Sequence, residues 1–172
     1  MGDIVITALD EEDRILETES VIKEIQTYEE VKDYSVRYSG NALLEANYKE
    51  RRDLSGERDT AAVIVTGINP TNEDSMSHIS SLLRDGAYLR DDEEGYILLG
   101  AYYLKEYAEN FGDIFDTVDA QTGDTVRLSA NGVTKEFVIK GIIESKVDEI
   151  NLSAYIPERE FRRIFGRLDR NA

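Results

Sequence analysis

The chain has 172 residues, of which 41% are hydrophobic, enough for one folded domain with a core of its own. It carries 36 acidic and 20 basic side chains, a net charge of −16, which disfavours binding to nucleic acid or to an anionic membrane surface. It contains no cysteine, so disulfides, zinc–thiolate sites and thiol catalysis are excluded.

The first third of the chain predicts one helix among several strands. Residues 4–9, IVITAL, predict a strand, and residues 18–31 predict a helix because their apolar side chains recur at helical spacing. The stretch 31–50 is rich in β-branched and aromatic residues, and Ser-Gly-Asn at 39–41 predicts a turn between two strands. Residues 49–59, KERRDLSGERD, predict a charged, solvated connection, with a docking patch for a partner as the alternative.

The middle of the chain predicts two buried strands, each followed by a helix. Residues 60–69 are apolar nearly throughout, which is typical of a central strand, and Pro70 ends it. A helix with an apolar side is predicted over 71–86, closed by a glycine. The run YILLG at 96–100 predicts a short buried strand, and 101–112 predict another helix.

A regular β-hairpin is predicted within residues 120–143. Asn131-Gly132 is a strong signal for a two-residue turn, because both positions must accept a positive φ. Such a turn pairs Ala130 with Val133, Leu128 with Lys135, Arg127 with Glu136 and Val126 with Phe137. Gly141 interrupts the second strand and predicts a bulge or a bend.

The C-terminal part predicts a strand followed by a helix. Apolar residues alternate over 150–156, which is the spacing of a strand. Phe161, Ile164 and Phe165 then share one face of a predicted helix, and Gly166 ends it.

We predict no catalytic, cofactor-binding or metal-binding residue and expect a protein that is not an enzyme. The single histidine, His78, lies among serines on the predicted helix, and neighbours on one helix rarely hold the geometry of a catalytic triad. The acidic run at 91–94 predicts a solvated surface turn, with a cation site as the alternative. The glycines form no phosphate-binding motif.

Four stretches follow one another along the chain in an order that indicates a family. They are a strand, Gly-x-Asx-Pro and a helix at 63–89; a strand, Gly-Ala and a helix at 96–112; a Gly-Asp-x-Val hairpin ending in Ile-Lys-Gly-Ile at 122–143; and a strand that feeds a helix at 151–157. Together they resemble the extracytoplasmic (periplasmic core) domain of MacB/FtsX/LolC-type ABC transporter permeases. The resemblance extends from about Ile4 to Phe165.

The resemblance implies an α+β fold with two lobes. A membrane-proximal mixed α/β lobe would comprise about residues 3–90 and 148–166, built from both chain ends. A distal lobe, about residues 91–147, would be inserted between them and would contain the β-hairpin. The 172 residues would then be a single extracytoplasmic domain, and Met1-Gly2 would be left from expression.

The resemblance also implies a place and a role. The domain would lie on the extracytoplasmic side of the cell membrane, between transmembrane helices 1 and 2 of a permease. It would need no cofactor and would transmit motion driven by a cognate cytoplasmic ABC ATPase, in efflux, lipoprotein release or related mechanotransmission. Its expected partners are that ATPase through the parent permease, a second permease subunit in a dimer, and an extracytoplasmic substrate or partner protein. The alternatives are a secreted binding or adhesion module and a free-standing enzyme that uses His78.

Overall fold

The computed structural model describes residues 4–8, 15–50, 58–108, 114 and 116–167. Its strands are β1 (Tyr38–Glu45), β2 (Thr60–Ile68), β3 (Leu83–Gly86), β4 (Tyr96–Gly100), β5 (Thr125–Ala130), β6 (Val133–Ile143) and β7 (Ser153–Pro157). Its α-helices are α1 (Thr18–Ile25), α2 (Pro70–Ser77), α3 (Lys105–Ala108), α4 (Asp148–Asn151) and α5 (Glu158–Phe165), and the 3-10 turns are η1 (Ile79–Leu82) and η2 (Ala101–Tyr103). None of these helices combines the length and the apolar character needed to cross a bilayer.

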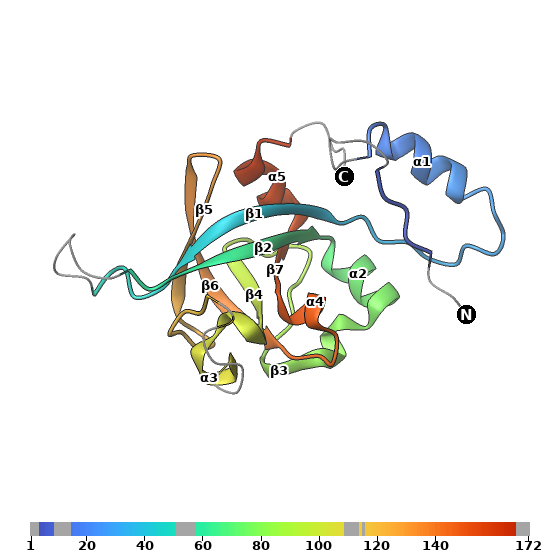
Figure 1. Ribbon diagram of the computed structural model, residues 1–172. Coiled ribbons are helices and arrows are strands. Elements are labelled where there is room, and N and C mark those ends of the chain that lie inside the picture. The colour runs from blue at the N-terminus through green and yellow to red at the C-terminus, as the bar shows by residue number, and fades with distance from the viewer. Residues whose placement is uncertain (1–3, 9–14, 51–57, 109–113, 115, 168–172) are drawn as a thin grey trace.

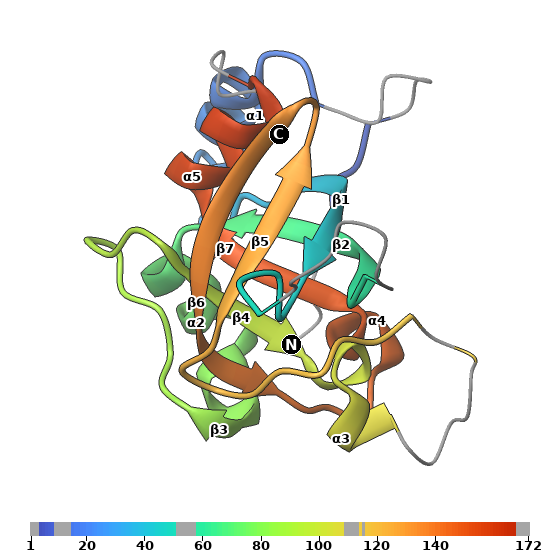
Figure 2. The ribbon, with the colours of Figure 1, turned by 90° about the vertical axis from the view of Figure 1, so that its left-hand side faces the viewer.

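Six of the strands close into a barrel (Figures 1 and 2). Around the ring the order is β6-β4-β7-β2-β1-β5, and β5 pairs with β6 to close it. The β2–β7 and β4–β6 pairs are parallel, and the other pairs in the ring are antiparallel. The seventh strand, β3, pairs with β6 outside the ring. Closure gives every strand of the ring two partners.

The predicted two-lobed α+β fold is therefore wrong. The strands expected in the proximal lobe, β1, β2 and β7, and those expected in the distal lobe, β4, β5 and β6, lie in one ring. The two sets join where β1 pairs with β5 and where β4 pairs with β7. The predicted hairpin is accordingly a part of the barrel wall and does not form the body of a separate lobe.

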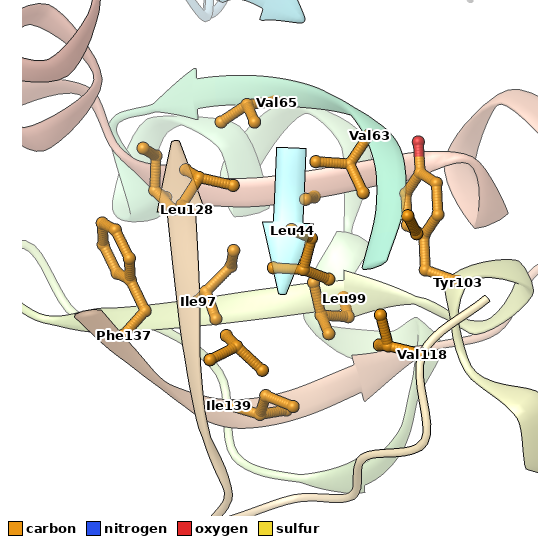
Figure 3. Close-up of a cluster of buried hydrophobic side chains, with 14 of the residues drawn as sticks. Leu44, Val63, Val65, Ile97, Leu99, Tyr103, Val118, Leu128, Phe137 and Ile139 are labelled. Atoms are coloured by element: carbon orange, nitrogen blue, oxygen red, sulfur yellow. The ribbon is translucent and has the colours of Figure 1, made fainter. Parts of the chain in front are cut away.

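The barrel encloses one continuous hydrophobic core (Figure 3). Leu44, Val65, Ile97, Leu128 and Ile139 are each fully buried and point into it from five different strands. Burying a side chain of this kind stabilises the folded state by about 1.5–3 kcal/mol. Strands from both predicted lobes thus contribute to the same core, which explains why they do not separate.

A second buried cluster lies on the outside of the barrel wall. It consists of Ile68, Ile79, Leu89, Leu98, Ile143 and Tyr155. Successive side chains of a strand point to opposite faces, so β4 sends Ile97 and Leu99 into the barrel and Leu98 into this outer cluster. This explains why YILLG is apolar throughout, as expected of a strand buried on both faces.

The hairpin prediction is confirmed in register and in turn. β5 and β6 pair Ala130 with Val133, Leu128 with Lys135 and Val126 with Phe137. Asn131 and Gly132 adopt positive φ values of 49° and 78°. The predicted bulge at Gly141 is confirmed as well, because the β4–β6 register shifts there: Ile97 pairs with Ile139 and Leu98 with Gly141.

Two strand predictions near the N-terminus are wrong. Residues 4–8 form no strand, with Ile4 85% and Val5 81% exposed, and residue 9 lies outside the described part. The Ser-Gly-Asn sequence at 39–41 is no turn, because one strand, β1, runs straight through it.

Gly40 has a packing role in β1 instead of a turn role. A Cβ on Gly40 would lie 2.5 Å from the Cε1 of Phe165, and a Cβ on Gly67 of β2 would lie 2.5 Å from the Cβ of Phe161. The two glycines thus make room for α5, whose two phenylalanine rings stack with their centroids 4.1 Å apart. At the start of α5, the buried Glu160 pairs with Lys135 of β6.

The helices are shorter than predicted. The helix expected over 71–86 ends at Ser77, because His78 adopts the left-handed conformation with φ 53°, and η1 and β3 follow. The helix expected over 18–31 ends at Ile25. Of the stretch 101–112, η2 and α3 are helical, and residues 109–113 lie outside the described part. Most of the charged connection at 49–59 lies outside it too.

Candidate functional site

The outer face of β2 leaves apolar side chains uncovered. Ala62 and Ile64 point outward, and they alternate with Val63 and Val65, which are buried in the barrel. Ile64 is 44% exposed, and Leu43, which lies opposite Ala62 on β1, is 41% exposed. This part of the barrel wall is therefore an apolar surface open to solvent.

A recess of about 290 Å³ lies over this surface. It is lined by Ala62, Ile64, Tyr103, Ile114, Asp116 and Leu152, and we refer to it as the β2 groove. Four of these side chains are aliphatic, and Asp116 is the one that carries a charge. The groove draws on β2, η2 and the residue that precedes β7, which are far apart in the sequence and are brought together by the barrel.

Tyr103 fixes the shape of the groove from beneath. Its hydroxyl donates a hydrogen bond to the carbonyl oxygen of Leu152 (2.5 Å) and accepts one from the backbone N–H of Ile64 (2.9 Å). It thereby ties together β2 and β7 where their parallel pairing begins, at Ile64 and Ser153. Burial raises the pKa of Tyr103, so the side chain stays neutral and keeps donating this hydrogen bond at physiological pH. The groove is therefore built into the fold.

The segment that carries Asp116 is anchored by Val118. Val118 is fully buried, and its backbone N–H donates to the carbonyl of Tyr103 (2.8 Å). The N–H of Lys105 donates in turn to the carbonyl of Val118 (3.1 Å). One residue further on, the N–H of Asp119 donates to the carboxylate of Asp59. These bonds hold the acidic side of the groove close to Tyr103.

A second and larger recess, of about 510 Å³, lies beside the start of α2. Its polar groups are already engaged within the protein. Asp91 accepts hydrogen bonds from the N–H and the hydroxyl of Thr71 (3.0 and 2.8 Å), and the Tyr88 hydroxyl donates to the carbonyl of Pro70 (3.1 Å). Asp74 accepts from the N–H of Ser80 (2.8 Å). These contacts give the polar groups a structural role in joining α2 to the chain before β4.

A polar clamp fastens the segment before β1 to α2. Glu73 is fully buried and accepts hydrogen bonds from Ser35 (2.7 Å) and from two nitrogens of Arg37 (2.6 and 2.9 Å). Burial alone would raise the pKa of Glu73, but these hydrogen bonds outweigh it and hold the pKa below its ordinary value. Asp33 binds the hydroxyl of Ser75 close by. The clamp fixes the base of the arm that carries α1, which stands apart from the barrel in Figure 1.

The structure places His78 where it cannot serve the serines near it. It is exposed and ends α2. The hydroxyls of three of the four neighbouring serines bind other acceptors: Ser75 binds Asp33, Ser77 the carbonyl of Glu73, and Ser81 the carbonyl of His78. The arrangement that a Ser-His-acid triad requires is thus not assembled around this histidine.

The acidic run at 91–94 forms a surface turn whose acids are engaged within the protein. Asp91 binds Thr71, and Glu94 pairs with Arg163. Asp92 and Glu93 both pair with Arg90, and Glu93 also pairs with Lys140. Within the described ranges, no three or more His, Asp or Glu side chains gather in a way that could hold a metal ion. The basic partners of these acids, Arg90, Lys140 and Arg163, come from different parts of the chain.

Sequence reasoning missed the β2 groove. The apolar run of β2 predicted a central strand, and it gives no sign that Ala62 and Ile64 are exposed to solvent. Their exposure depends on which elements cover the wall, and that is a property of the ring order. Comparison with known proteins finds no model of a protein family that matches the sequence and no matching protein of curated function.

Proposed function

We propose that this protein is a non-catalytic binding domain and that the β2 groove is its recognition site. The observation that carries the proposal is a preformed apolar recess, open to solvent, in the wall of a barrel whose own core is already filled. Ile64 and Ala62 lie next to the exposed Leu43 of the neighbouring strand, and exposed apolar side chains that adjoin one another often mark an interaction site. Hydrogen bonds from Tyr103 hold the recess open in advance, which lowers the cost of binding.

We further propose that the domain works on the extracytoplasmic side of a transport permease. The four sequence stretches support this setting. The expected two-lobed fold does not support it, because the strands form one barrel. The arrangement of the helices is compatible with attachment at one end, because α1 and α5 lie at the same end of the molecule in both views (Figures 1 and 2). α5 covers Gly67, and the groove lies at Ala62 and Ile64, toward the other end of β2.

In this setting the domain performs no chemistry of its own. The energy comes from ATP hydrolysis by a cytoplasmic ATPase, and a second permease subunit forms the dimer. The groove recognises an extracytoplasmic partner protein. Because a closed barrel resists deformation, it can carry a displacement from its attached end to the bound partner as one body.

Selection from a random displayed peptide library tests the binding proposal. The library is panned on the wild-type protein and on two variants, Ile64→Asp in the groove and Val133→Asp at the hairpin tip. The two aliphatic side chains are similarly exposed, at 44% and 42%. We expect peptides that bind the wild type and Val133→Asp but not a correctly folded Ile64→Asp. Peptides that bind all three equally, or no enrichment at all, would overturn the proposal.

The permease setting has a separate test. We expect the gene to encode an apolar stretch of about 20 residues on each side of this domain, long enough to span a bilayer. Reporter fusions placed before, within and after the domain should put it outside the cytoplasm. A reporter that places the domain in the cytoplasm would contradict the setting without touching the binding proposal.

A further inference from the structure

We infer that the β2 groove receives the side chain of a lysine or arginine from a partner protein. This inference rests on the proposed binding function and names its ligand. The groove combines an aliphatic wall with one carboxylate, and a basic side chain combines an aliphatic stem with a charged head.

The lining sets the chemistry of the occupant. Ile64, Ile114 and Leu152 offer aliphatic surface, and the Tyr103 hydroxyl already donates one hydrogen bond and accepts another. The carboxylate of Asp116 is then the charged group of the lining that a ligand meets. Lysine and arginine bury their methylene stems along apolar surface while the charged head stays at a polar rim. Such a side chain satisfies both parts of the lining.

The recess is large enough for one long side chain and lies at the lower limit of the size of ligand pockets. Pockets for cofactors and drug-sized molecules generally enclose about 300–1,000 Å³. The β2 groove encloses about 290 Å³ and is open on one side. A single long side chain, presented by a partner that covers the neighbouring Leu43, matches this size and this exposed surface.

The charge of the protein selects the same class of partner. A net charge of −16 attracts cationic surfaces and repels anionic ones, among them nucleic acid and anionic lipid headgroups. It also opposes the docking of a second copy through this face, because two such copies repel each other. A basic segment of another protein is therefore the occupant that both the groove and the overall field favour.

Three blocked pentapeptides test the inference by NMR titration of the methyl-labelled protein. They carry lysine, norleucine or glutamate between pairs of glycines, so that norleucine keeps the stem without the charge. The protein variants are Asp116→Asn in the groove and Glu30→Gln as a control that removes one exposed carboxylate elsewhere. The titrations follow the methyl signals of Ile64 and Leu152.

We expect the lysine peptide to shift both methyl signals and to bind more tightly than the norleucine peptide. Asp116→Asn should weaken the lysine peptide about two- to fivefold, as for an exposed ion pair, and leave the norleucine peptide unchanged. Glu30→Gln should change neither. Norleucine or glutamate binding as tightly as lysine, with no effect of Asp116→Asn, would overturn the inference and leave the groove a binding site. If no pentapeptide shifts the groove methyls and the library also fails, the inference and the proposed function fall together.

Discussion

Gly67 of β2 lies so close to α5 that a methyl group on it would stand 2.5 Å from the Cβ of Phe161. No real Cβ tolerates that separation, and the obstructing atom belongs to the rigid start of a side chain that is fully buried. α5 can therefore pack this closely on the barrel only because residue 67 of β2 has no side chain.

Gly67→Ala should lower the free energy of unfolding by roughly 1–3 kcal/mol, because overpacking forces the helix and the strand apart. Gly40→Ala should cost less, since its added methyl meets only the ring at the far end of the partly exposed Phe165 side chain, and no atom close to the backbone. Urea denaturation of the wild type and both variants measures the difference. Equal stability of Gly67→Ala and the wild type would mean that α5 is not seated as described.

Gly132→Val should lower the free energy of unfolding by about 1–2 kcal/mol through backbone strain. Gly132 has a φ of 78°, and an added Cβ there meets no atom within 4 Å, so steric contact contributes nothing. Gly132→Asn should cost less, because asparagine tolerates the left-handed region. Thermal unfolding of both variants checks the order, and a valine variant as stable as the asparagine variant would exclude this turn.

Glu73→Gln should change how stability depends on pH. The folded-state pKa of Glu73 lies below its ordinary value of 4.5, so its ionised form stabilises the fold above that value. This contribution is lost as the pH falls through the lower folded-state pKa. The variant should be less stable at pH 7 and lose less stability between about pH 5 and pH 3.

Denaturation at a series of pH values measures this change, with Glu30→Gln as the control for loss of an exposed carboxylate. The control should follow the wild-type curve closely. Parallel curves for Glu73→Gln and the wild type would show that the clamp with Arg37 and Ser35 does not form.

Tyr103→Phe should weaken both the fold and the groove. The change removes the hydroxyl that joins the N–H of Ile64 to the carbonyl of Leu152, and leaves both backbone groups without that partner. Such a loss costs about 1–3 kcal/mol. We expect lower thermal stability together with weaker binding of library-selected peptides. Tyr107→Phe, which alters a tyrosine outside the groove lining, is the matched control and should bind as the wild type does.

The parts of the fold that the sequence predicts are those fixed by neighbouring residues. The turn at Asn131-Gly132 sets the register of β5 and β6 from within the hairpin, so the pairing could be derived residue by residue. The buried strand at 96–100 also follows from its own composition. For the hairpin and for this strand, the residues within the segment are enough to predict its structure.

The parts that the sequence does not predict depend on distant contacts. In the sequence, Gly40 resembles a turn residue. Its packing role depends on contact with Phe165, which is distant in the sequence. The hairpin joins the rest of the ring where Leu44 of β1 pairs with Leu128 of β5, and periodicity carries no information about such a pairing. The exposure of Ile64 follows from the same ring, because the side chains around it come from separate parts of the chain. The candidate site was therefore inaccessible to sequence reasoning.

Intermolecular NOEs can locate a library-selected peptide on the protein and so test directly whether the β2 groove is the binding site. We expect NOEs from the peptide to the methyl groups of Ile64 and Leu152 and to the ring of Tyr103. NOEs confined to another surface, such as α1 or the recess beside α2, with those three side chains silent, would contradict it.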